Sequence, residues 1–191
     1  MPTYTRAFVP GGTFFFTVVT NFRRPILVTP ASRHFLRTAI EETRARYPFT
    51  SRAFVLLPDH LHCIWTLPDG DADFSVRWRL IKSRFSILYR NGGGAETGRS
   101  RSRQGQRERG IWQRRFWEHT VRDERDYEAF CDYIHYNPVK HDLVKCPHDW
   151  PFTSFHRAVR LGRYPMDWAC TCEGQRAPVP DFERIMRTIG E

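Results

Sequence analysis

Two histidines, His60 and His62, stand one residue apart in an otherwise apolar stretch, LLPDHLHCIWTL at residues 56–67. The Pro-Asp pair in this stretch is typical of a tight turn, and β-forming apolar residues lie on both sides of it, so the stretch predicts a β-hairpin. Successive side chains of a strand point to opposite faces. The two histidines therefore share one face of the second strand, and the other face carries Leu61, Cys63 and Trp65.

Turn signals and hydrophobic periodicity predict the elements around this hairpin. We expect strands at residues 14–20, 52–57, 60–67 and 117–121, and helices at 30–47, at 74–89, from Asp123 to near Pro138, and a short one ending at Leu161. The order β-α-β-β-α-β followed by a further helix is that of an α+β protein with a ferredoxin-like antiparallel sheet, with helices on one face. Residues 91–110 are rich in Gly, Ser and Arg and predict a mobile loop.

The charge of the chain indicates its class of partner. Its 191 residues carry a net charge of +9, and of its 30 basic residues only Lys82, Lys140 and Lys145 are lysines. A GC-rich genome would explain the preference for arginine, but not the excess of basic over acidic residues. We expect a polyanion as partner, because guanidinium groups bind phosphate and stack on bases. Five irregularly spaced cysteines and the lack of a membrane-spanning apolar run predict a cytoplasmic protein with no membrane or evident protein partner.

The helix after Asp123 offers a third ligand for a metal held by the histidine pair. Asn137 points in nearly the same direction as Phe130, the centre of the apolar stripe of this helix. Tyr133 lies at the edge of the stripe, and Tyr136 points towards solvent. If the helix packs near the histidine face, two imidazoles, an amide oxygen and a phenol meet, a set that fits Mg²⁺ or Mn²⁺ and attack on a phosphodiester. Histidine spacing alone does not establish a metal site, and Tyr133 taken alone is interpreted as an ordinary half-buried tyrosine.

These residues lie in two motifs that resemble those of a known family. His60-Leu61-His62 resembles the HUH motif, and YIHYNPVKHDLV, at residues 133–144, resembles the tyrosine motif of the REP-associated tyrosine transposases, bacterial relatives of the single-strand transposases of small insertion sequences. Three further segments resemble that family in order and spacing: WRLIKSRFS, GIWQRRFWEHTVRDERDY and DWPFTSFHR. The resemblance covers about residues 3–165, and we expect one transposase domain at 1–165 followed by a tail at 166–191.

The resemblance implies a metal-dependent single-stranded DNA endonuclease and strand transferase, which cleaves and rejoins DNA at palindromic repeat hairpins. By this resemblance His60 and His62 hold a divalent metal, Mg²⁺ or Mn²⁺, with Asn137 as the third protein ligand. Tyr133 is the nucleophile, and its attack on the phosphate gives a 5′-phosphotyrosine link and a free 3′-hydroxyl. Such a protein would be associated with the nucleoid.

Basic and aromatic side chains predict the DNA-binding surface, because single strands are held by stacking on aromatic rings beside arginines. The helix at 74–89 carries basic residues around its apolar stripe, and two arginines adjoin aromatic residues before the last strand. The alternative is that the aromatics are core residues and the charges are merely solvated. The predicted DNA-binding residues are Arg77, Arg79, Lys82, Arg84, Arg114, Arg115, Trp117 and Lys140.

Two other functions compete with this one. A ferredoxin-like module that only binds single-stranded nucleic acid would lack the covalent chemistry. A histidine-nucleophile nucleotide hydrolase would need a further histidine at the next position on the same strand face, and that position is Ile64. In the tail, Cys170-Thr171-Cys172 is a weak metal motif without further ligands and stays unassigned.

Overall fold

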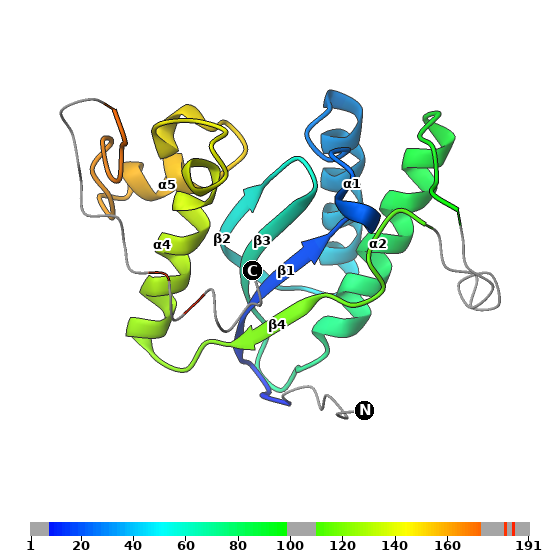
Figure 1. The fold of residues 1–191 in the computed structure, drawn as a ribbon. Coiled ribbons are helices and arrows are strands. Elements are labelled where there is room, and N and C mark those ends of the chain that lie inside the picture. The colour runs from blue at the N-terminus through cyan, green and yellow to red at the C-terminus, as the bar shows by residue number, and fades with distance from the viewer. Residues whose placement is uncertain (1–7, 99–109, 173–181, 183–184, 186–191) are drawn as a thin grey trace, which may run out of the picture.

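The fold is built on a four-stranded antiparallel sheet (Figure 1). The structure is a computed structural model, and it describes residues 8–98, 110–172, 182 and 185. In space the strands follow the order β2-β3-β1-β4. Their bounds are Thr13–Val19 for β1, Thr50–Leu56 for β2, His60–Thr66 for β3 and Trp117–Thr120 for β4. The four predicted strands and the hairpin between β2 and β3 are thereby confirmed, with small shifts at the strand ends.

Helices cover both faces of this sheet. α1 (Pro30–Arg46) and α2 (Phe74–Asn91) pack together on one face, and α4 (Glu124–Lys140) lies on the other (Figure 1). The prediction of helices on one face therefore holds for the two ferredoxin-like helices α1 and α2, while the tyrosine-bearing helix takes the opposite face. The shorter helices are η1 (Asn21–Arg23), η2 (Pro147–Asp149) and α5 (Phe155–Arg160).

The apolar residues of the central strands explain why both faces are covered. In β1, Phe14 and Phe16 belong to the core under α1 and α2, and Phe15 belongs to the core under α4. In β3, Trp65 stacks on Trp78 of α2 with ring centroids 4.2 Å apart. A strand with apolar side chains on both faces is stable only when each face is packed against another layer. The face of β3 that carries the histidines is therefore an interior surface.

Local sequence signals place the helix ends. Side chains of Thr29, Asp73 and Asp123 each accept a hydrogen bond from the backbone N–H three residues on, at the starts of α1, α2 and α4. α4 was expected to end near Pro138, and it ends two residues later, at Lys140. Of the predicted loop at 91–110, residues 99–109 lie outside the described residues. Within the described part of the chain, no helix is both long and apolar enough to cross a lipid bilayer.

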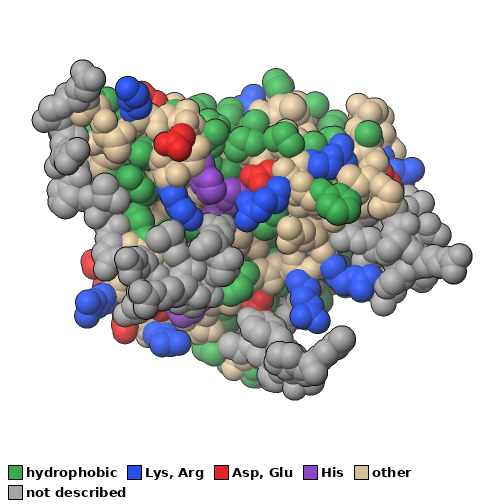
Figure 2. Space-filling view, viewed as in Figure 1, with side chains coloured by type: hydrophobic (Ala, Val, Ile, Leu, Met, Phe, Trp, Pro, Cys, Tyr) green, Lys and Arg blue, Asp and Glu red, His purple; other side chains and the backbone are tan. Residues whose placement is uncertain are grey.

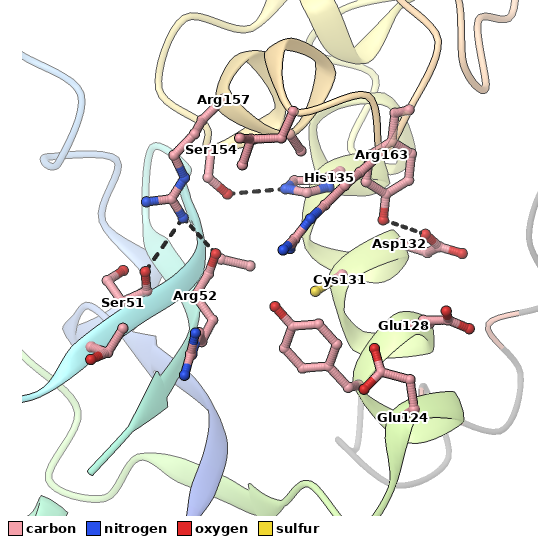
Figure 3. Close-up of a pocket in the computed structure, with 16 residues that line it drawn as sticks. Ser51, Arg52, Glu124, Glu128, Cys131, Asp132, His135, Ser154, Arg157 and Arg163 are labelled. Carbon is pink, nitrogen blue, oxygen red and sulfur yellow. Dashed lines mark hydrogen bonds between the residues drawn. The ribbon is translucent and has the colours of Figure 1, made fainter. Parts of the chain in front are cut away.

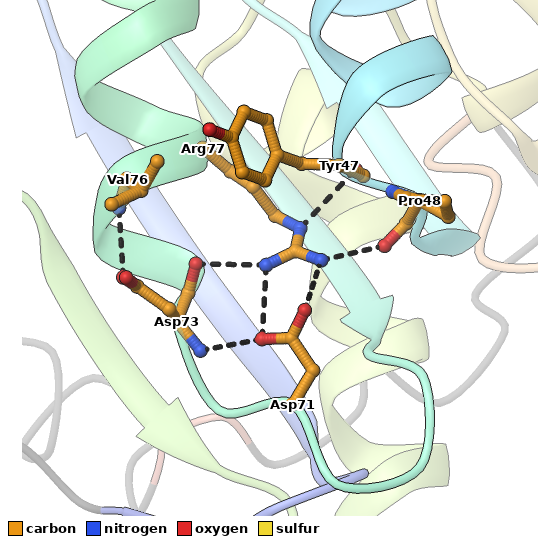
Figure 4. Close-up of polar contacts among 6 residues, drawn as sticks. All are labelled: Tyr47, Pro48, Asp71, Asp73, Val76 and Arg77. Carbon is orange, nitrogen blue, oxygen red and sulfur yellow. Dashed lines mark hydrogen bonds and ion pairs between the residues drawn. The ribbon is translucent and has the colours of Figure 1, made fainter.

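Arg77 of α2 is a structural residue and does not lie on an exposed basic surface (Figure 4). Its side chain is only 1% exposed. The guanidinium forms two hydrogen bonds to the carboxylate of Asp71, at 2.6 and 3.1 Å, and three more to the backbone carbonyls of Tyr47, Pro48 and Asp73. These five bonds match the five N–H donors of arginine. The prediction that Arg77 binds DNA is wrong, because its side chain turns inward to join the end of α1 to the start of α2.

Because Arg77 forms this network, its replacement by alanine should strongly destabilise the fold. The hydrogen bond from Arg77 lowers the pKa of Asp71 from its ordinary value, so the pair is ionised at neutral pH. We expect Arg77→Ala to lower the free energy of unfolding by about 3 kcal/mol, since three carbonyls and a carboxylate lose their donors. Urea unfolding followed by circular dichroism measures this. Arg79→Ala, on the exposed side of the same helix, is the matched control and should cost at most about 0.5 kcal/mol.

Candidate metal and tyrosine site

The two histidines of β3 lie side by side under α4. His60 and His62 are 1% and 0% exposed, and their ring centroids are 4.9 Å apart. His62 contacts the rings of both Phe15 and Tyr133, at 5.5 and 5.3 Å between ring centroids. The alternation inferred from the sequence is confirmed, because Leu61, Cys63 and Trp65 belong to the opposite core.

Asp59 fixes the orientation and the tautomer of His60. The carboxylate of Asp59 lies 2.6 Å from Nδ1 of His60 and also accepts a hydrogen bond from Arg23 at 3.2 Å. Burial acts to raise the pKa of Asp59, but the hydrogen bonds and charges of His60 and Arg23 outweigh it and lower the pKa below its ordinary value. An ionised carboxylate can only accept a hydrogen bond, so the proton of the neutral imidazole lies on Nδ1. Nε2 of His60 then offers a lone pair to a metal.

His62 is held in the same way by a neighbouring strand. Its Nδ1 lies 2.9 Å from Oγ1 of Thr17, and both residues are buried. Thr17 is the direct partner of His62 in the β1–β3 register, so the pairing of the strands itself positions this hydroxyl. Nε2 of His62 is the ring nitrogen on the side away from that contact, and it is the second candidate ligand.

α4 carries the candidate oxygen ligand, Asn137. Tyr133, Asn137 and His141 follow one another at intervals of four residues and so share one side of the helix. Tyr133 contacts the ring of His62, and His141 contacts that of His60 at 5.1 Å, so Asn137, one turn from each, lies over the histidine pair. Its amide Nδ2 donates to the carbonyl of Tyr133 at 3.4 Å, which leaves Oδ1 as the available acceptor.

The donor set fits a divalent cation. Among the described residues, the buried Nε2 of His60 and Oδ1 of Asn137 have no hydrogen-bond partner. Buried acceptors of this kind cost free energy unless a ligand satisfies them. Two imidazole nitrogens and one amide oxygen suit Mg²⁺ or Mn²⁺ that takes its remaining ligands from phosphate and water.

Lys140 lies beside the hydroxyl of Tyr133. The tyrosine side chain is fully buried, and Nζ of Lys140 donates a hydrogen bond to its Oη at 3.1 Å. The same ammonium lies 5.0 Å from the centroid of the tyrosine ring. Lys140 was predicted from the sequence to contact DNA, and the structure shows that its charge is directed at the phenol.

Tyr136 differs from its sequence-based prediction, and His141 adds a residue to the surroundings of the site. Tyr136 was expected to point towards solvent, yet it is 9% exposed and stacks on Phe182 at 5.3 Å. Phe182 also contacts Tyr133, at 5.5 Å, so one aromatic residue of the tail packs against both tyrosines. His141, half-buried just after α4, lies against His60. The sequence indicates this location of His141, because the residue follows Asn137 by one helical turn.

The comparisons with known proteins agree on one family. Residues 11–137 match the model of the IS200-like transposases. An Escherichia coli REP-associated tyrosine transposase is 47% identical over 169 residues, which are 88% of this chain and 92% of that protein. A Haemophilus influenzae protein named for the same group is 42% identical over 88% of this chain and 93% of its own length. The chain belongs to the REP-associated tyrosine transposases of the IS200-like family.

A solved member of the family shares the fold of this transposase. That structure, a REP-associated tyrosine transposase bound to a REP hairpin, has a TM-score of 0.74 and 44% sequence identity. The alignment covers 94% of this chain and 96% of that one. The α+β fold predicted from the sequence is therefore confirmed both by the coordinates and by a relative.

The remaining predicted DNA-binding residues of this transposase lie in different environments. Arg79, Arg114 and Arg115 are exposed. Lys82 donates to the backbone carbonyls of Gln113 and Arg114, and Arg84 forms a two-bond ion pair with Glu42. Trp117 is half-buried against Phe15 at the sheet face under α4. On the face shown in Figure 2, histidine side chains reach the surface between basic side chains.

A cavity of about 720 Å³ lies on the other side of α4 (Figure 3). It is lined by the start of β2, by α4, by α5 and by the segment that follows α5. His135 lines this cavity, and it is two residues from Tyr133, or about 200° around the helix. Its Nε2 lies 3.0 Å from the hydroxyl of Ser154. None of the four predicted metal and tyrosine residues lines the cavity. The candidate metal and tyrosine site therefore lies outside this cavity.

The buried, neutral side chain of His135 should make the stability of the fold sensitive to acid. Burial, with the positive charges of Arg157 and Arg163, lowers the pKa of His135 to about 3. The unfolded chain, with an ordinary histidine pKa near 6.5, binds the proton first as the pH falls. Stability should therefore be lost between about pH 6.5 and 3, by up to about 1.4 kcal/mol per pH unit, and be unaffected by this group above pH 7.

The measurement is urea unfolding at several pH values, compared between the wild type and His135→Gln. Glutamine can keep a hydrogen bond to Ser154 but does not titrate. The variant should lose stability less steeply than the wild type below pH 6.5. Equal slopes for the two proteins would contradict a neutral buried His135.

Proposed function

We propose that this chain is a metal-dependent single-stranded DNA endonuclease and strand transferase, which cleaves and rejoins DNA at palindromic repeat hairpins through a 5′-phosphotyrosine intermediate. The observation that carries the proposal is that the Tyr133 side chain lies in one buried site with two oriented imidazoles and the side-chain amide of Asn137. A relative of 44% identity is known in complex with a REP hairpin, which supports the same class of DNA partner here.

In this proposal His60, His62 and Asn137 hold a divalent metal, Mg²⁺ or Mn²⁺. When bound, the metal supplies a positive charge that polarises a non-bridging phosphate oxygen and offsets charge that develops during attack. Asp59 and Thr17 position the two imidazoles, and the α4 backbone positions the amide. Such supporting contacts matter because a nucleophile and its phosphate must be aligned before reaction.

Tyr133 is the nucleophile. Its Oη forms a bond to phosphorus while the bond from phosphorus to the 3′ oxygen breaks, which leaves the 5′-phosphate on the tyrosine and a free 3′-hydroxyl. The ammonium of Lys140, already hydrogen-bonded to Oη, stabilises the phenolate as the phenol loses its proton. The reverse attack by a 3′-hydroxyl rejoins the strand, because the phosphotyrosine link keeps the energy of the phosphodiester.

Fewer residues are proposed to contact the DNA backbone than the sequence predicted. Arg79, Arg114 and Arg115 are the exposed members of the predicted set. Lys82 and Arg84 already bind protein groups, so DNA would have to displace a carbonyl or a carboxylate to reach them. We keep residues 1–165 as the proposed transposase domain and 166–191 as its tail.

The test is the covalent intermediate. Labelled single-stranded oligonucleotides that carry palindromic repeats from the source genome are incubated with the protein and Mn²⁺ or Mg²⁺, and the products are separated on a denaturing gel. We expect a metal-dependent protein–DNA band that disappears in Tyr133→Phe. The matched control is Tyr136→Phe, which alters the other tyrosine of the same helix and should keep the band.

A binding module without chemistry predicts a different outcome. It would bind the hairpin tightly and give no covalent band in the wild type with any repeat or either metal. A band lost only in Tyr136→Phe would keep the reaction class but overturn the role of Tyr133.

A further inference from the structure

Three cysteines and a histidine converge beside α4, away from the histidine pair of β3. Cys146 and His148 bracket the start of η2, and Cys170 and Cys172 lie in the segment after α5. Sγ of Cys146 is 3.4 Å from Sγ of Cys172, and Nδ1 of His148 is 3.9 Å from Sγ of Cys170. The ligand atoms of Cys146, His148 and Cys170 all lie within 4.8 Å of one another. The C-x-C pair that the sequence left unassigned thus meets a C-x-H pair.

The backbone holds these two pairs together. The N–H and the hydroxyl of Thr171 both donate to the carbonyl of Lys145, at 2.9 and 3.1 Å. The residue between the two cysteines of one pair is therefore fixed against the residue before the other pair. Cys146 and Cys170 are buried, and η2 packs against α4. The cluster is thus a built feature of the fold and not a chance meeting of surface side chains.

We infer that Cys146, His148, Cys170 and Cys172 form a structural zinc site. In a tetrahedral site with zinc–sulfur bonds near 2.3 Å and zinc–nitrogen bonds near 2.0 Å, neighbouring ligand atoms lie roughly 3.5–3.8 Å apart. The measured 3.4 and 3.9 Å separations are close to that spacing. Thiolates are soft ligands that favour zinc over Mg²⁺ or Mn²⁺. Four protein ligands leave no open position for a substrate, so the site is structural.

A neighbouring carboxylate supports His148 as the fourth ligand. Nε2 of His148 lies 3.3 Å from a carboxylate oxygen of Asp149. With its proton on Nε2 directed at Asp149, the imidazole presents the Nδ1 lone pair towards the cysteines, as metal-bound histidines commonly do. Nδ1 then gives up its 3.0 Å contact with the carbonyl of Met166. Zinc binding also releases the three thiol protons.

The zinc site excludes the other bond that these cysteines can form. In this structure Cys146 and Cys170 are joined by a disulfide, which uses two of the four proposed ligands. Zinc binds only the reduced thiolates, so the metal and the disulfide are alternative states of the same cluster. Both the disulfide and the zinc site link Cys146 to Cys170, 24 positions later in the sequence. Both therefore hold the segment around Ala169 against α4. This inference does not depend on the proposed DNA chemistry.

The first test is the metal content of the full-length protein, purified in the presence of a thiol reductant. We expect about one zinc ion per chain by mass spectrometric metal analysis. Replacement by Co²⁺ should give the visible bands of a tetrahedral site together with a thiolate-to-cobalt charge-transfer band. Reduced wild-type protein without stoichiometric zinc, or a Cys146–Cys170 disulfide that persists under reductant, overturns the inference.

Variants assign the ligands. Cys172→Ser, the least disruptive change because this residue is half-exposed, should weaken zinc binding at least about tenfold, and Cys170→Ser should abolish stoichiometric binding. Cys131→Ser removes a cysteine of α4 outside the cluster and should keep the zinc and the charge-transfer band. His60→Ala should also keep them, which separates this metal from the one proposed for the tyrosine site. Zinc retained equally in Cys170→Ser and the wild type contradicts the assignment.

Discussion

The packing of α4 on the sheet face that carries Phe15, His62 and Ile64 is the contact on which the site depends. Phe130 of α4 packs on Phe15 with ring centroids 4.5 Å apart, and this apolar contact fixes the height and rotation of the helix. Tyr133 and Asn137 then face the histidines because they lie one and two turns further along the same side. A ferredoxin-like sheet alone would expose both imidazoles, and α4 makes them part of an interior site.

The candidate ligands are buried polar groups, and their burial costs free energy of folding. His60 and Asn137 each present a buried acceptor whose desolvation nothing in the described residues offsets. In the proposed site a cation would satisfy these acceptors, and the contacts of Asp59 and Thr17 would limit the reorganisation needed to bind it. The proposed zinc cluster differs in kind: its soft thiolates select another metal, so one chain can keep two metals apart.

Much of this arrangement could be predicted from local sequence. Strand alternation placed His60 and His62 on one face, and helix periodicity placed Asn137 with Phe130. The misassigned residues depend on contacts distant in sequence. Arg77 looks exposed on a helical projection, but the end of α1 supplies the carbonyls that draw it inward. Tyr136 is buried by Phe182, and Thr17 could be recognised only from the strand register. The convergence of Cys146 with Cys172 likewise requires the backbone contact between Lys145 and Thr171.

The central claim is that His60 and His62 bind one metal beside Tyr133. Pulsed electron paramagnetic resonance of Mn²⁺ bound to the full chain, with its histidines labelled with nitrogen-15, tests this most directly. The account predicts coupling of the metal to two imidazole nitrogens in the wild type, and to one in His60→Ala. Bound Mn²⁺ that shows no histidine coupling, or the same coupling in the wild type and His60→Ala, would contradict it.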